Sequence, residues 1–307
     1  MKKNVRNPLY AALLSAGLLA ANPLPAEPAA KTAPATQAQA EAQSPAAQSV
    51  QGEVDKNSQE RVDAKRKEIL RDAVKAVVET ENALRALDAG KKEDALKALE
   101  KATGKLELVL ARDPSLALAP VDVSETTFDL LADTKTIKSM IYDAEKALRD
   151  GRIQVARGIL LNLASEIVLR TTSIPLGTYP DAIKAVTPLI DAGKIDEAKA
   201  ALVAALNTLV TEVEVIPLPV LRAGYLLTHA EKLAEKAKRD DKENKMLDAL
   251  LKEARNQIQM AELLGYGDKD AFQPMYEQLD QIEEKAKNGN SGSGWFTKIK
   301  KELSELF

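Results

Sequence analysis

The chain has 307 residues, carries 43 lysine and arginine against 46 aspartate and glutamate residues, and contains no cysteine. The balanced charge argues against a nucleic-acid binder, which needs a basic surface, and an aromatic content of 4% leaves few side chains on which bases could stack. Without cysteine there is no disulfide and no thiol chemistry, so packing alone must stabilise the fold.

Residues 1–26 have the order of a secretory signal peptide. Basic residues precede an apolar run at 9–21, and small residues and prolines follow it. The run of 13 residues is shorter than the roughly 20 that a membrane-spanning helix needs, which disfavours an uncleaved anchor. Ala21 and Ala26 are both candidate cleavage positions. We therefore expect a bacterial protein exported to the periplasm.

Composition divides the rest of the chain into four segments. Residues 27–58 are rich in Ala, Pro and Gln and have almost no large apolar side chain, which predicts a disordered tether. Residues 59–287 are long enough for one sizeable domain. Residues 288–294 (NGNSGSG) predict a flexible linker, and residues 295–307 predict a separate amphipathic helix.

The domain at 59–287 predicts an all-α fold. Its apolar residues recur at helical spacing, for example Ile137, Ile141, Ala144 and Leu148. Alternation at period two is nearly absent, and the β-branched cluster at 213–216 stands beside proline, where we expect a helix to end.

Three segments share a pattern anchored on glycine. Alanine follows each glycine after five residues, leucine after nine and proline after 24. We interpret each segment as an αα-hairpin in which glycine closes the first helix, the alanine allows close packing, and proline marks the end of the second helix. The positions are Gly90, Ala95, Leu99 and Pro114; Gly151, Ala156, Leu160 and Pro175; and Gly193, Ala198, Leu202 and Pro217.

The spacing of these segments is uneven, because the glycines lie 61 and 42 residues apart. An uneven period favours an irregular helical bundle over a regular solenoid, and it disfavours tetratricopeptide repeats, which keep a period of about 34 residues. Three C-terminal helices are predicted at 221–239, 246–264 and 272–287. The rigid Pro-Leu segments after the hairpins, at 175–180 and 216–219, either cap the core, which we favour, or line a binding groove.

The pattern over residues 59–286 resembles the YfdX family of bacterial periplasmic proteins. Residues 88–114, 173–223 and 226–235 carry the resemblance. It implies an all-α envelope protein linked to stress responses, with chaperone-like or ligand-binding roles. It implies no catalytic residues, and the proline-rich segment and the C-terminal tail look like additions to the family core.

The sequence offers little for catalysis, and we expect no enzyme, no cofactor and no metal site. The single histidine, His229, has no partner at helical spacing, so we expect a structural or surface role. A small-molecule enzyme that uses carboxylates is the alternative function. The obvious carboxylates fall on predicted polar helix faces, where solvation is their ordinary role: Asp94, Glu100, Glu107, Asp196 and Glu197.

The predicted interaction element is the C-terminal helix. Its apolar side chains are Trp295, Phe296, Ile299, Leu303, Leu306 and Phe307. A helix of 13 residues is marginal alone, so something must receive its apolar face. We expect docking onto an envelope protein or onto the membrane, peripheral to the inner membrane; packing onto the chain's own bundle is the alternative. Homo-oligomerisation stays open, and the expected function is periplasmic, stress-related binding or scaffolding with chaperone-like action.

Overall fold

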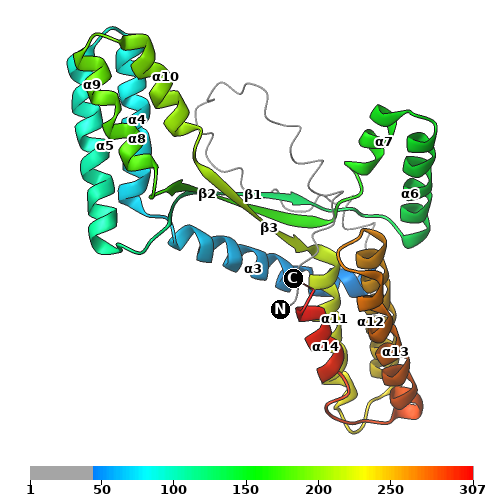
Figure 1. Cartoon of the computed structure of the whole chain (residues 1–307). Helices are drawn as coiled ribbons and strands as arrows, with labels where there is room; N and C mark the ends of the chain where they lie inside the picture. The colour runs from blue at the N-terminus through cyan, green and yellow to red at the C-terminus, as the bar shows by residue number, and fades with distance from the viewer. Residues whose placement is uncertain (1–43, 307) are drawn as a thin grey trace. The chain divides into compact units, whose positions relative to one another are not determined.

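The computed structural model describes residues 44–306, of which 68% are helical and 11% are in strands (Figure 1). The predominantly helical character expected from the sequence is therefore confirmed. The helices are α3 (Pro45–Lys67), α4 (Arg71–Asp88), α5 (Lys92–Arg112), α6 (Thr134–Arg149), α7 (Ile153–Leu160), α8 (Tyr179–Lys184), α9 (Val186–Asp191), α10 (Ile195–Leu206), α11 (Leu218–Ala234), α12 (Asp241–Leu263), α13 (Lys269–Ala286), the 3₁₀ helix η2 (Lys287–Gly289) and α14 (Thr297–Ser304).

The fold also contains a three-stranded antiparallel sheet, so the all-α prediction was wrong in this respect. Its strands are β1 (Leu118–Phe128), β2 (Glu166–Pro175) and β3 (Val210–Pro217), in the order β1-β2-β3. The central strand β2 pairs along its length with β1, and from Glu166 to Ser173 with β3.

The strands were not predicted from the sequence, because their apolar and polar residues do not alternate in a simple way. Strand β2 is buried on both faces over most of its length, so it has no polar face to alternate with an apolar one. The β-branched cluster at 213–216, which was expected at a helix end, belongs to β3 and pairs with residues 167–170 of β2. Pairing with a neighbour, not periodicity, makes these residues strands.

The three glycines that anchor the shared pattern each lie in a turn between two helices. Gly90, Gly151 and Gly193 have φ angles of 71°, 71° and 74°, a left-handed conformation that glycine adopts without steric cost. After the first of them, the amide of Lys91 donates to the carbonyl of Ala86 at 2.8 Å, and the equivalent amides close the other two turns. The glycine thus closes each helix in the same way.

Beyond the turn the three segments differ. The helices that follow have 21, 8 and 12 residues (α5, α7 and α10). Pro114 follows α5, but Pro175 and Pro217 are the last residues of β2 and β3. A strand therefore separates helix and proline in the second and third segments, and the expected direct exit from helix to proline is wrong there.

The N-terminal boundary of the described fold also differs from the expectation. Residues 45–58, assigned to the tether, form the first part of α3. Small residues are buried along this helix every three or four positions, and Val54 and Val62 pack against Ile167 and Ile216 of the sheet. The tertiary contact explains how a Gln- and Ser-rich sequence forms a helix here.

Two large apolar clusters hold the remaining helices. One is formed by α4, α5 and α8–α10 together with residues at the ends of β1 and β2, and the other by α11–α14. A small cluster packs α6 against α12 through Ile137, Met260 and Leu264. The bounds of α11, α12 and α13 lie within about five residues of those predicted.

Within residues 44–306, no helix combines the length and the hydropathy needed to cross a bilayer. The predicted signal peptide at 1–26 and residues 27–43 of the predicted tether lie outside the described residues.

Candidate functional site

A buried ion pair lies where α3, α11 and the segment after β1 meet. Arg222 of α11 is 2% exposed. Its guanidinium donates two parallel hydrogen bonds to the carboxylate of Asp129, Nη1 to Oδ1 at 3.0 Å and Nη2 to Oδ2 at 2.7 Å, while Nε donates to Gln51 Oε1 at 3.2 Å. The bidentate geometry satisfies a charge that would be costly to bury alone.

Ser165 extends this polar cluster toward the sheet. Its Oγ donates to Asp129 Oδ1 at 3.2 Å, its amide donates to the Tyr266 hydroxyl at 2.8 Å, and its carbonyl accepts from the amide of Leu218 at 2.9 Å. One residue thereby joins the end of β1, the start of α11 and the loop between α12 and α13.

Glu166, the next residue, is a buried carboxyl. Burial raises the pKa of Glu166, an effect that a hydrogen bond with Tyr266 partly offsets. Its Oε2 atom has no hydrogen-bond partner within the described part of the chain. Folding therefore shifts the equilibrium of this carboxyl toward its neutral form, relative to an exposed glutamate.

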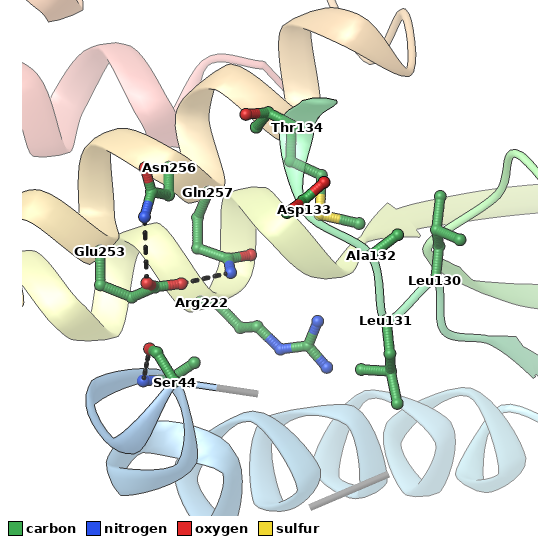
Figure 2. A pocket seen from close by; sticks show the side chains of 12 residues that line it. Ser44, Leu130, Leu131, Ala132, Asp133, Thr134, Arg222, Glu253, Asn256 and Gln257 are labelled. Atoms are coloured by element: carbon green, nitrogen blue, oxygen red, sulfur yellow. Dashed lines mark hydrogen bonds between the residues drawn. The ribbon is translucent and has the colours of Figure 1, made fainter. Parts of the chain in front are cut away.

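A cavity of about 270 Å³ opens beside the ion pair (Figure 2). Glu253, Asn256 and Gln257, all from α12, form its polar end, and the guanidinium of Arg222 reaches between α3 and the segment 130–134. The other lining residues are Ser44, Ala47, Leu130, Leu131, Ala132, Asp133, Thr134 and Met260.

Hydrogen bonds fix the polar side chains around this cavity. Glu253 accepts from Gln257 Nε2 at 2.8 Å and from Asn256 Nδ2 at 3.3 Å (Figure 2). Asp133 caps α6 by accepting from the amide of Thr136 at 2.7 Å, and this bond lowers the pKa of Asp133. Ser44 caps α3 in the same manner, so the walls are held in place before any ligand arrives.

The cavity combines acidic and apolar surfaces. Glu253 has no ion-pair partner within residues 44–306, whereas the charge of Arg222 is neutralised by Asp129. Among the same residues, no group of three or more His, Cys, Asp or Glu side chains is placed to hold a metal ion. The arrangement is suited to binding a small molecule that carries a positive charge and a compact apolar part.

His229 has a partner outside its own helix. Its Nε2 lies 2.6 Å from Oε2 of Glu53, which comes from α3 and not from the helix of His229 itself. Both side chains are partly exposed. The contact joins α11 to α3, and solvent screening keeps such a pair weak.

The predicted interaction helix packs onto the protein's own core. Phe296, Ile299 and Leu303 are buried in the α11–α14 cluster, with Trp295 and Leu306 packed against it; Phe307 lies outside the described residues. This is the alternative that the sequence left open. In this structure the chain's own bundle covers this apolar face, and docking onto an envelope protein or the membrane stays a prediction.

Polar contacts fix the tail in the same position. Lys300 Nζ lies 2.7 Å from Glu231 Oε2 of α11, and Gln278 of α13 donates to Glu302. The segment predicted as a flexible linker also contacts the bundle, because the amide of Gly292 donates to the carbonyl of Ala234 at 3.1 Å. Helix α14 is therefore part of the bundle.

The cluster around Arg222 was missed by the sequence analysis, although one signal was present. Arg222 interrupts the apolar run LPVLRAGYLL at 218–227, and an arginine in such a run is seldom buried without a partner. Its partners Asp129 and Gln51, and Ser165, which donates to Asp129, come from distant parts of the chain. No local pattern could have assigned them.

Comparison with known proteins finds a match to one family model. Residues 76–215, just under half of the chain, match a family model described as YfdX protein. Among solved structures, a crystal structure of YfdX from Salmonella Typhi is similar, with 16% sequence identity, coverage of 49% of this chain and 93% of that chain, and a TM-score of 0.34. The search of curated proteins finds no match.

Proposed function

We propose that this chain, a member of the YfdX family through residues 76–215, is a non-catalytic periplasmic protein that acts by binding a small organic cation. The observation that supports the proposal most directly is Glu253, a carboxylate without an ion-pair partner within residues 44–306 that lines the cavity between α3, α11 and α12. A stress-related role is what the family resemblance implies.

The cavity limits the kind of ligand. Its volume of about 270 Å³ lies just below the roughly 300–1,000 Å³ of sites for drug-sized molecules, so the ligand is small. Met260, Leu130 and Ala132 supply apolar contact, while Glu253 supplies the charge. A primary amine on a compact apolar body, such as phenethylammonium, matches both ends of the cavity.

The test is calorimetric titration of the full chain with phenethylamine and with its neutral analogue 2-phenylethanol. We expect the amine to bind and the alcohol to bind at least about tenfold more weakly, because only the amine pairs with the carboxylate. Glu253→Gln should weaken amine binding by a similar factor, and Glu235→Gln, at the exposed C-terminal cap of α11, should not. Equal binding of the two compounds, or unchanged binding by Glu253→Gln, would refute the proposal.

Two other functions make different predictions. A chaperone-like protein should suppress light scattering from a thermally unfolding client, and Glu253→Gln should not change that suppression. An enzyme should convert its ligand, so mass spectrometry of the bound amine after prolonged incubation would show a product. The non-catalytic proposal requires the amine to be recovered intact.

Periplasmic location is a separate part of the proposal and rests on the sequence of residues 1–26. Fractionation of expressing cells, with mass spectrometry of the mature N-terminus, tests it. A chain retained in the cytoplasm with residues 1–26 intact would contradict this location.

A further inference from the structure

The α6–α7 hairpin, residues 134–161, exposes large apolar side chains. Ile153 and Leu161 are 63% and 58% exposed, and Tyr142, Leu148 and Val155 are also exposed. These are five of the twelve large apolar side chains that the described part of the chain exposes, within about a tenth of its length. Such a concentration marks a contact surface and not scattered exposure.

The hairpin has the opposite charge to the rest of the chain. It contains six lysine and arginine residues against three aspartate and glutamate residues, whereas the whole chain has a net charge of -3. Two of the acidic residues are already paired, Glu145 with Arg149 at 3.5 Å and Asp150 with Arg152 at 3.1 Å. Lys138, Lys146 and Arg157 carry no ion pair within residues 44–306, and the hairpin keeps a net charge of +3.

Contacts with the rest of the protein leave this surface free. Helix α6 packs on α12 through Ile137, and α7, whose one buried residue is Ala156, packs on α6. The exposed apolar residues follow the contact with α12 along the chain, toward and beyond the turn at Gly151. The hairpin is thus held through α12, and its exposed apolar side chains lie on α6, at the start of α7 and, with Leu161, at the end of α7.

We propose that the α6–α7 hairpin docks onto the surface of a bilayer that contains anionic lipid. Apolar side chains enter the boundary between head groups and acyl chains, while lysine and arginine remain at the level of the head groups. Ile153 and Val155 are two positions apart on α7 and so point about 200° apart around the helix. Side chains that project from several sides of the hairpin are accommodated by a fluid layer and not by a groove of fixed shape.

A second copy of the chain is a poorer occupant of this surface. Two copies of the hairpin would bring together six unmatched positive charges, three from each, and like charges in contact are unfavourable. Anionic lipid supplies the complementary charge.

The first test is co-sedimentation of the full chain with vesicles of phosphatidylcholine alone or with a quarter phosphatidylglycerol. We expect binding only to the anionic vesicles, weakened by salt. Ile153→Gln with Leu161→Gln should weaken it at least about tenfold. The matched control is Leu108→Gln with Val203→Gln, a pair of exposed apolar residues on α5 and α10, which should bind as the native chain does. The N-terminal apolar run is present in all of these proteins and cancels in the comparison.

A charge variant separates the electrostatic contribution to vesicle binding from the apolar contribution. Lys146→Glu with Arg157→Glu should abolish the preference for anionic vesicles, whereas Lys238→Glu with Lys269→Glu, the same charge change at exposed positions outside the hairpin, should retain it. Circular dichroism checks that each variant is folded.

A site-specific probe locates the contact. Because the chain has no cysteine, Gln154→Cys gives a single attachment point for an environment-sensitive dye between Ile153 and Val155. We expect a blue shift with anionic vesicles at this position and none at Lys269→Cys. Native binding by the Ile153/Leu161 variant, or no shift at position 154, would overturn the proposal. So would self-association that this variant abolishes, because the surface would then join two copies.

Discussion

Removal of the Asp129 carboxylate tests whether the polar cluster holds the fold together. Asp129→Ala leaves the guanidinium of Arg222 buried without its bidentate partner, and breaking a buried pair in this way costs about 3–5 kcal/mol. We expect about 3 kcal/mol, the lower end, because the Asp129 side chain is 20% exposed and water can replace part of the interaction. For a protein of this size the loss corresponds to a fall in melting temperature of roughly 6–12 °C.

The measurement is urea unfolding followed by circular dichroism, with the fluorescence of the single tryptophan, Trp295, as a second probe of the α11–α14 cluster. Glu145→Ala is the matched control, because it removes a carboxylate from an exposed pair with Arg149 and should cost no more than about 0.5 kcal/mol. If the two substitutions cost the same, the buried pair has no special structural role.

The double variant Asp129→Leu with Arg222→Met separates the value of the pair from the cost of an unpaired charge. Apolar replacement of both members is often neutral, so we expect the double variant to lose less than half of what Asp129→Ala loses. A larger loss would show that the hydrogen bonds to Gln51 and Ser165 matter as much as the charge.

Three further predictions concern other parts of the molecule. Gly151→Ala, at a φ of 71°, should lower the unfolding free energy by about 1–2 kcal/mol, whereas Gly104→Ala inside α5 should raise it by about 0.5–1 kcal/mol; neither new Cβ meets another atom. Glu166→Gln should stabilise the protein increasingly as pH rises above 4.5, the ordinary pKa of a glutamate. The raised pKa of Glu166 means that the native carboxyl contributes stability at low pH, and this contribution is lost as the carboxyl ionises. A difference in unfolding free energy between variant and native chain that stays constant from pH 4 to pH 7 would contradict this linkage. Phe296→Ala should cost about 3–5 kcal/mol in the same urea assay, and a loss below about 1 kcal/mol would mean that α14 is not part of the core.

The sequence predicted local features of the fold well where one residue type dictates the backbone. The positive φ at Gly90, Gly151 and Gly193 follows from glycine itself, and the helices α11–α13 follow from apolar residues at helical spacing. The sheet could not be predicted in this way. Strand β2 is buried on both faces, and its partners lie up to 57 residues away in register, so its pairing is not encoded locally.

The candidate site was less predictable than the fold. Arg222 is conspicuous in an apolar run, yet its partners Gln51 and Asp129 come from α3 and from the segment after β1. Glu253 reads as one more polar residue of an amphipathic helix, and only the packing of α12 against α3 and the segment 130–134 gives it a cavity to line. A polar site whose residues come from distant segments cannot be predicted from local sequence patterns.

The local pattern of an amphipathic helix predicts which face is apolar, but it does not predict what covers that face. The amphipathic pattern of the C-terminal helix predicted that Phe296, Ile299 and Leu303 are covered, but it did not predict which surface covers them. In the structure they pack onto the chain's own core, and the ion pair between Lys300 and Glu231 is one of the contacts that hold the helix there. The α6–α7 hairpin is the converse case. Once the contact of α6 with α12 is made, apolar side chains remain uncovered among basic ones that have no ion pair within residues 44–306. The α6–α7 hairpin, and not the C-terminal helix, therefore leaves apolar side chains uncovered in this structure.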